Sequence, residues 1–224
     1  MTDAEWQQSR NLVTRVRAID PCRFDRKLRL FAVACCRRVA DLLRDPDARA
    51  LLELVEGVAD GAADPESLRP VWGEVPWYPH AEGAVKLAAA LDCASWRASA
   101  DCYRRAAQDA EAATAGAMAG DTAADAQAKY ERRGRERAAQ LALLRDVVGS
   151  PFRAVTFLPV WGTDTAVALA RQMYESRDFS AMPILADALQ DAGCDSEAIL
   201  SHCRDASATH VRGCWVVDLV LGKE

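Results

Sequence analysis

This chain of 224 residues is poor in the features that usually reveal a function, and each absence narrows the possibilities. Glycine and proline are sparse, at 12 and 9 residues, and 50% of the residues are apolar, which is the profile of an ordinary globular protein. No apolar run approaches the roughly 20 residues of a membrane-spanning helix. The net charge is −5, whereas nucleic-acid coats and anionic-membrane binders need a basic surface. We therefore expect neither a membrane nor a nucleic acid as partner.

The sequence also lacks an export signal and the common catalytic signatures. Its first residues, MTDAEWQQSR, contain no apolar segment of the kind found in secretory signals. Eight cysteines in a chain without such a signal favour reduced thiols over a disulfide framework, so we expect a cytoplasmic protein. No GxSxG, HExxH, GxGxxG or phosphate-loop motif occurs.

Helix signals dominate the sequence. They predict an all-α fold, a multi-helix bundle with a long alanine-rich hairpin. Asp-Pro pairs suit helix starts, because aspartate caps the first amides and proline tolerates the first helical position. The best boundary is Gly149-Ser150-Pro151, which predicts regions 1–149 and 150–224 that share one core. The expected helices cover about 3–19, 24–44, 46–59, 81–118 and 122–148 and begin near Thr163, Pro183, Asp195 and Thr209.

The clearest predicted helix, 24–44, has an apolar stripe that includes Leu28, Phe31 and Cys35. Arginines lie on its opposite face, where we expect solvent. Cys35 and its neighbour Cys36 are interpreted as buried thiols, because free cysteine is among the most buried residue types. A vicinal redox pair is the alternative, although adjacent helical side chains point roughly 100° apart.

Two other stretches allow a binding interpretation beside a structural one. The loop 70–80 carries Trp72 and Trp77, which could line a pocket for a peptide or a ring or plug the space between helices. The segment 129–137 (KYERRGRER) is locally basic. A solvated helix face is typical of such a charge run, and a nucleic-acid contact is the alternative.

Three segments resemble an abundant family of uncharacterised planctomycete proteins. They are DRKLRLFAVACCRR (25–38), SPFRAV (150–155) and the stretch 182–224, which begins MPILADALQDAGCD. The start MTDAEW also matches the MTEAEW-like opening of that family. The resemblance covers both ends of the chain and leaves the alanine-rich middle unmatched, and it implies no activity, because none is established for the family.

The tail, residues 191–223, concentrates the rarest side chains of the chain. It holds three of the eight cysteines and two of the three histidines: Cys194, Cys203, Cys214, His202 and His210. The favoured interpretation is that the thiols fill a core and the histidines bond backbone groups, so that no cofactor is bound.

The first alternative for the tail is a zinc site, which needs four nitrogen or sulfur ligands in a tetrahedron. Cys194, Cys203, His210 and Cys214 could supply them. The last two resemble the HxxxC half of the zinc-binding anti-sigma motif, but Val217 replaces the second cysteine of its CxxC half.

The second alternative is a cysteine nucleophile. In the predicted last helix, His210, Cys214 and Asp218 are four residues apart and share one stripe, so that Cys214 could act as nucleophile, His210 as base and Asp218 as orienting group. One straight helix would point all three outward, which argues against this triad.

Arginines flank the cysteines at Arg37, Arg38, Arg204 and Arg212. If the second helix packs on the tail, they form a basic rim suited to an acidic protein partner or a phosphate-bearing ligand. The sequence thus favours a non-enzymatic protein-interaction or scaffold module, with a zinc-stabilised regulatory module and a cysteine-dependent enzyme as alternatives. It also predicts that Cys35 and Trp215 are buried and that Trp215→Ala costs about 3–5 kcal/mol.

Overall fold

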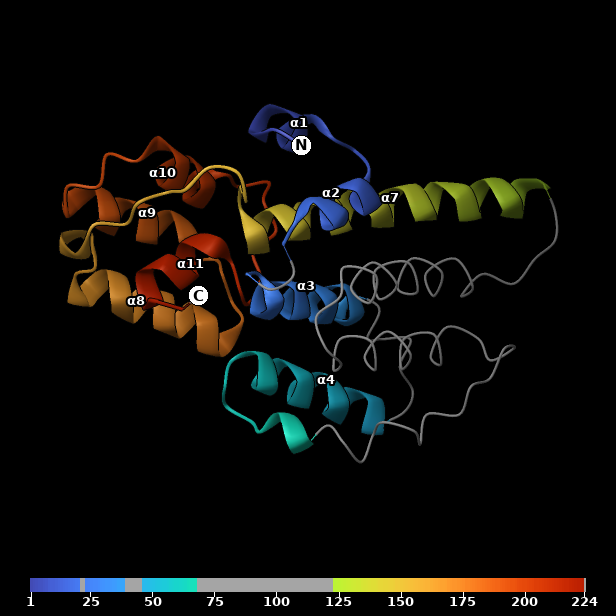
Figure 1. The fold of residues 1–224 in the computed structure, drawn as a ribbon, viewed down its shortest axis with the longest axis horizontal. Helices are drawn as coiled ribbons and strands as arrows, with labels where there is room; N and C mark the ends of the chain where they lie inside the picture. Colours follow the sequence, from blue (N-terminus) through green and yellow to red (C-terminus); the bar gives the residue numbers. More distant parts are fainter. Residues whose placement is uncertain (21–22, 39–45, 68–122, 224) are drawn as a thin grey trace. The chain divides into compact units, whose positions relative to one another are not determined.

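The computed structural model describes residues 1–20, 23–38, 46–67 and 123–223, and every regular element in this part of the chain is a helix (Figure 1). The predicted all-α fold is therefore confirmed. The chain divides into two compact units, Asp3–Leu141 and Ala142–Glu224, which are described separately below. None of the described helices is both long and apolar enough to cross a membrane. The loop with Trp72 and Trp77 and the first arm of the expected hairpin lie outside the described residues.

The N-terminal unit begins with two short helices where the sequence predicts one. They are α1 (Asp3–Gln8) and α2 (Leu12–Ala18). The prediction was wrong because Asn11 is extended, and its side chain accepts the Thr14 amide as the N-cap of α2. The guanidinium group of Arg15 stacks over the Trp6 ring at 5.0 Å, and both side chains are buried.

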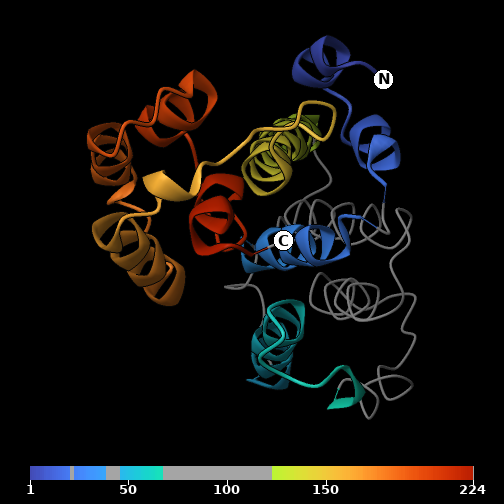
Figure 2. The ribbon, with the colours of Figure 1, turned by 60° about the vertical axis from the view of Figure 1, so that its left-hand side comes forward.

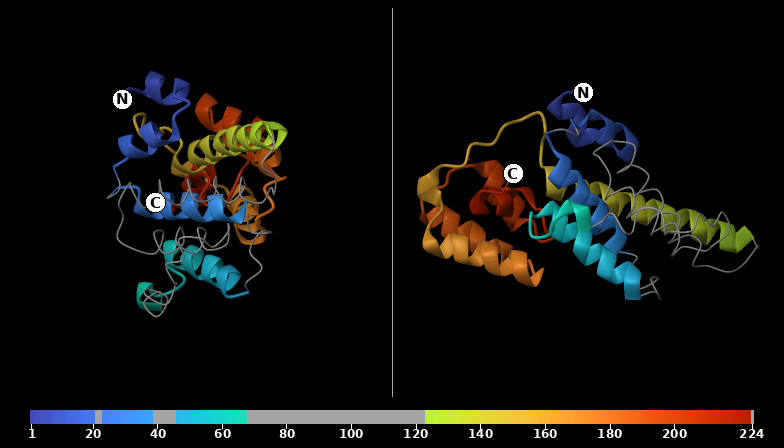
Figure 3. Two further views of the ribbon diagram at one scale, coloured as in Figure 1. Left: turned by 90° about the vertical axis from the view of Figure 1, so that its right-hand side faces the viewer. Right: turned by 60° about the horizontal axis from the view of Figure 1, so that its bottom comes forward.

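Helices α3 (Asp25–Arg37) and α4 (Pro46–Ala59) pack on each other in this unit (Figure 3). The predicted stripe of α3 is buried, including Cys35. Its arginines, however, do not form the expected solvated face, because Arg26 pairs with Asp60 at 2.9 Å and Arg37 pairs with Glu56 at 2.8 Å. Both arginines form ion pairs with α4 or the residue that follows it, where the sequence predicts contact with solvent. Residues 39–45, the expected end of this helix, lie outside the described residues.

The long helix α7 (Ala123–Val148) is the expected second arm of the hairpin. In the N-terminal unit, the fork of Arg38 contacts both carboxylate oxygens of the buried Glu136 on α7 at 3.1 Å. The division between the units falls within α7, so its last two turns belong to the C-terminal unit. The helix ends at Gly149, which has a φ of 66° that favours glycine.

The C-terminal unit contains a 3₁₀ turn, η3 (Pro159–Trp161), and four helices, α8 (Asp164–Ser176), α9 (Met182–Asp191), α10 (Glu197–Arg204) and α11 (Trp215–Leu221). Helix α8 packs against α9 and α11, and α9 packs against α10 (Figure 2). As predicted, Thr163 caps α8 by accepting the Ala166 amide. The buried side chains of these helices, among them Met173, Leu185, Ile199, Cys203 and Val217, form one hydrophobic core.

The tail differs from the sequence prediction at two helix starts. The N-cap of α10 is Ser196 rather than Asp195. The last helix begins at Trp215 rather than near Thr209, because Gly213 has a φ of 93° that interrupts a helix. Trp215 is only partly buried at the edge of the core, whereas the sequence predicts a buried side chain.

Candidate metal centre

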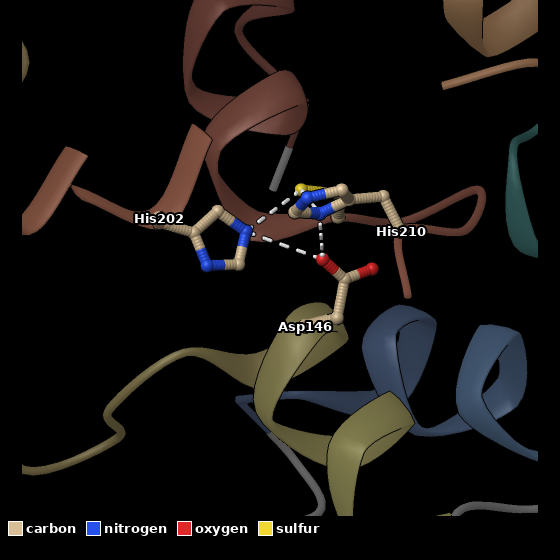
Figure 4. Close-up of side chains that lie close together, drawn as sticks. Asp146, His202 and His210 are labelled. Carbon is tan, nitrogen blue, oxygen red and sulfur yellow. Dashed lines mark hydrogen bonds and ion pairs between the residues drawn. The ribbon is translucent and has the colours of Figure 1, made fainter. Parts of the chain in front are cut away.

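Four side chains from three separate segments of the C-terminal unit converge on one point (Figure 4). Asp146 lies in the last turn of α7, His202 lies in α10, and His210 and Cys214 belong to the non-helical stretch before α11. Their ligand atoms all lie within 4.8 Å of one another. We call these four residues the tail cluster.

The contacts inside the tail cluster run from side chain to side chain. The Nε2 atom of His202 lies 3.3 Å from the Cys214 Sγ atom and 3.2 Å from Asp146 Oδ1. The Nδ1 atom of His210 lies 2.7 Å from the same Oδ1 atom and 3.9 Å from Sγ. The sequence predicts that the histidines bond backbone groups, and the structure corrects this, because their ring nitrogens contact a carboxylate and a thiol. The other nitrogen of His210, Nε2, is buried without a hydrogen-bond partner.

The cluster is largely shielded from water. The side chains of Asp146, His210 and His202 are 3%, 6% and 17% exposed, and Cys214 is fully buried. Burial raises the pKa of the Asp146 carboxyl, but the hydrogen bonds from His202 and His210 outweigh it and lower the pKa overall. Burial, reinforced by the Asp146 charge, raises the pKa of the Cys214 thiol well above its usual value. The buried site thus combines a carboxylate, two imidazoles and a protonated thiol.

Local structure holds the cluster in place. The second carboxylate oxygen of Asp146, Oδ2, accepts the backbone N–H of Val211 at 2.9 Å, so this carboxylate both joins the cluster and fixes the turn that carries His210. The rings of His202 and His210 meet edge to face at 4.9 Å, and His202 also lies 5.1 Å from the Trp215 ring. Each histidine ring is therefore oriented by a neighbouring ring as well as by its polar contacts.

The sequence identified half of this cluster. His210 and Cys214 belong to the predicted zinc set, but Cys194 and Cys203 do not join them and instead lie in the hydrophobic core of the unit. Burial and the proximity of Cys194 raise the pKa of the Cys203 thiol to about 12, as expected of a core thiol. The sequence missed His202 as a ligand, and it missed Asp146, which is 64 residues from His210.

The predicted catalytic triad is rearranged. Asp218 is buried in α11 and lies outside the tail cluster. Asp146 contacts His210 in its place, and the late start of α11 removes the common helical stripe that the prediction required. A cysteine nucleophile also needs a lowered pKa, whereas burial raises the pKa of Cys214. The geometry suits metal coordination better than nucleophilic attack.

The four arginines of the expected basic rim all have acceptors within their own unit. Beside the contacts of Arg37 and Arg38 described above, Arg204 contacts Asp187 at 2.9 Å and Gln190 at 2.6 Å. Arg212 donates to the Tyr174 carbonyl at 3.1 Å and covers the Tyr174 ring at 4.8 Å. These groups fasten helices inside each unit. The packing of the second helix on the tail, which the rim requires, stays a prediction.

Comparison with known proteins gives no match: no family model, curated protein or solved structure is significantly similar to this chain. The resemblance to planctomycete proteins therefore stays a prediction.

Proposed function

We propose that this chain is a non-enzymatic protein-interaction module that binds an extended segment of a partner protein along residues 152–160. The observation that carries the proposal is the surface of this stretch. Phe152, Leu158 and Val160 are exposed, and the exposed fraction of Val160 is 68%. Several large apolar side chains that remain exposed along one segment of a folded unit are a candidate interaction surface.

The backbone of this stretch supports the same proposal. Val155 and Phe157 pack against the core of the C-terminal unit, while the alternate residues Ala154, Thr156 and Leu158 are exposed. This alternation is that of a strand with one face buried. The peptide groups of Ala154–Phe157 form no hydrogen bond with another described residue. A second extended backbone can add to such an edge, with specificity supplied by alternate side chains.

The sequence suggested an acidic partner held by arginines, and we base the proposal on the apolar stretch instead. Arg37, Arg38, Arg204 and Arg212 already contact acceptors in the chain, so an acidic partner would have to replace existing bonds. Within the described part of the chain the peptide groups of Ala154–Phe157 have no hydrogen bond to lose, so a partner strand there would replace only bonds to water, which is the smaller cost.

The test compares acidic substitutions inside and outside the stretch. The chain of 224 residues is used as bait in cell extract, and captured proteins are quantified for the wild type, Leu158→Asp and Val160→Asp. Ile184→Asp is the matched control, because Ile184 is similarly exposed at 59% but lies on α9. We expect a captured set that both stretch variants lose and the control retains.

A purified partner from that set then allows a direct measurement. Amide hydrogen exchange at Ala154–Phe157 should be fast in the free chain and slow in the complex, because those amides have no partner within the described chain. Capture that survives both stretch variants would contradict the proposal.

A further inference from the structure

The tail cluster carries an inference that goes beyond an interaction module. We propose that Asp146, His202, His210 and Cys214 bind one Zn²⁺ ion in a closed structural site that joins the end of α7 to α10 and to the turn before α11. The ligand atoms are Asp146 Oδ1, His202 Nε2, His210 Nδ1 and Cys214 Sγ, the four that already converge.

Four of the six distances between these atoms bracket those expected around a tetrahedral ion, and all six lie within 4.8 Å. With zinc–nitrogen and zinc–oxygen distances of about 2.0–2.1 Å and a zinc–sulfur distance of about 2.3 Å, tetrahedral ligands lie about 3.3–3.6 Å apart. The His202 Nε2 atom already lies 3.3 Å from sulfur and 3.2 Å from oxygen. The two contacts of His210 Nδ1, at 2.7 Å and 3.9 Å, deviate from the ideal in opposite directions. Coordination would therefore move that ring away from Asp146 and toward Cys214.

Charge balance gives an independent reason for a divalent cation. The Asp146 carboxylate is 3% exposed, and a nearby positive charge stabilises a buried carboxylate beyond what its hydrogen bonds provide. On binding, the Cys214 thiol releases its proton to solvent and bonds to zinc as thiolate, while both histidines coordinate as neutral imidazoles. The two negative charges of Asp146 and Cys214 then cancel the two positive charges of the ion. The completed site is neutral, which suits a buried position.

The ligand types select zinc among the common metals. Calcium and magnesium prefer sites made entirely of oxygen, and the tail cluster offers a single carboxylate. One thiolate, two imidazoles and one carboxylate in a tetrahedral arrangement are typical zinc donors. Because four protein side chains fill the coordination shell and shield it from water, no position remains for a substrate. We therefore assign a structural role to the ion.

The contact between Asp146 and the Val211 backbone N–H extends the site beyond the direct ligands. Such outer contacts orient a ligand and are commonly found around metal sites. Here the contact holds the carboxylate of α7 against the turn that also carries His210 and Cys214. The turn is thus prepared for the ion by a bond that needs no metal.

Metal analysis of the full chain, purified without chelator, tests the proposal. We expect about one equivalent of zinc per chain. Replacement by Co²⁺ should give the intense thiolate-to-cobalt charge-transfer band of a cysteine ligand and the visible bands of a tetrahedral ion. This measurement uses the wild-type protein and does not depend on the stability of any variant.

Variants then identify the ligands. Asp146→Asn, His202→Gln and Cys214→Ser should each weaken cobalt binding by more than about 100-fold, because changes in outer contacts alone typically cost about 10–100-fold. Cys203→Ser is the matched control, since it also replaces a buried thiol of the same core but one outside the cluster. It should retain the full equivalent and the unchanged charge-transfer band.

Two results would overturn the proposal. The first is a wild-type chain that holds no zinc and shows no charge-transfer band when refolded with Co²⁺, which would make the cluster a metal-free network of histidine and aspartate. The second is retention of metal in Asp146→Asn and His202→Gln together with its loss in Cys203→Ser, which would assign the ion to the cysteines suggested by the sequence. Neither result depends on partner binding through residues 152–160.

Discussion

Substitution of Gly149 by alanine tests how firmly the end of α7 is attached to the tail. Gly149 ends the helix with a φ of 66°, and its amide donates to the Arg145 carbonyl at 2.9 Å. A Cβ atom added here would lie 3.0 Å from Cγ and 3.2 Å from Cδ2 of Trp215. Ordinary carbon contacts are about 3.5–4.0 Å, so the indole ring would have to move by at least about half an ångström.

Two costs add in this variant. A left-handed backbone costs an L-residue about 1–2 kcal/mol, and forcing an extra methyl group into a packed contact costs about 1–3 kcal/mol. We therefore expect Gly149→Ala to lower the free energy of unfolding by about 2–5 kcal/mol. Gly222→Ala is the matched control, because Gly222 has a φ of 65° but no atom within 4 Å of the added Cβ. It should lose only the backbone part, about 1–2 kcal/mol.

Urea denaturation followed by far-ultraviolet circular dichroism measures both variants, with free energies from linear extrapolation. The comparison is internal to the C-terminal unit, since Gly149, Gly222 and Trp215 all belong to it. If Gly149→Ala costs no more than Gly222→Ala, then Trp215 does not pack against the end of α7, and the description of this junction is wrong.

Three further predictions concern single side chains. Arg38→Ala should destabilise the N-terminal unit by about 1–3 kcal/mol, because the Glu136 carboxylate, which is 6% exposed, loses the hydrogen bonds from the Arg38 fork. Arg204→Ala breaks an ion pair with Asp187, which is 72% exposed, and should cost at most about 1 kcal/mol in the same denaturation assay. Cys203, with a pKa of about 12, should have roughly a thousandth of the usual thiolate fraction at pH 8. Alkylation of the native chain, followed by mass spectrometry, should therefore leave Cys203 unmodified. The stability that its protonated thiol contributes is fully present below about pH 9 and is lost as the pH rises toward 12. Trp215→Ala should cost about 2–3 kcal/mol in urea denaturation, below the 3–5 kcal/mol expected from sequence, because Trp215 is only partly buried.

The elements that could be predicted are those whose signals are local. Pro46 at the first position of α4 and Thr163 at the N-cap of α8 are cues contained within a few residues, and both helices begin where the sequence places them. The prediction of a single helix over 3–19 was wrong because it overlooked another local signal. Asparagine is as good an N-cap as serine, and the Asn11 side chain caps a second helix. Reading Asn11 as a cap would have found the break.

The tail was harder, because its conformation depends on a residue far away in the sequence. His210 and Cys214 are four residues apart, which fits a helix, and only Gly213 argues against one locally. The Asp146 carboxylate holds the Val211 amide at 2.9 Å and so takes a backbone donor that the turn would otherwise leave unpaired. Nothing in residues 191–223 indicates that partner.

The position of Asp146 in the sequence is itself informative, although helix propensity alone does not reveal it. It lies in the stretch LALLRDVV at the end of α7, where Leu143, Leu144 and Val147 are buried. An aspartate on the apolar face of a helix is costly unless it is paired, so its presence there predicts a buried partner that carries a positive charge or donates hydrogen bonds. The three histidines of the chain were the places to look for that partner, and two of them contact this carboxylate. A lone acid within an apolar stripe is therefore the feature that locates the tail cluster, and the cysteines that first attract notice are, apart from Cys214, packing residues of the core.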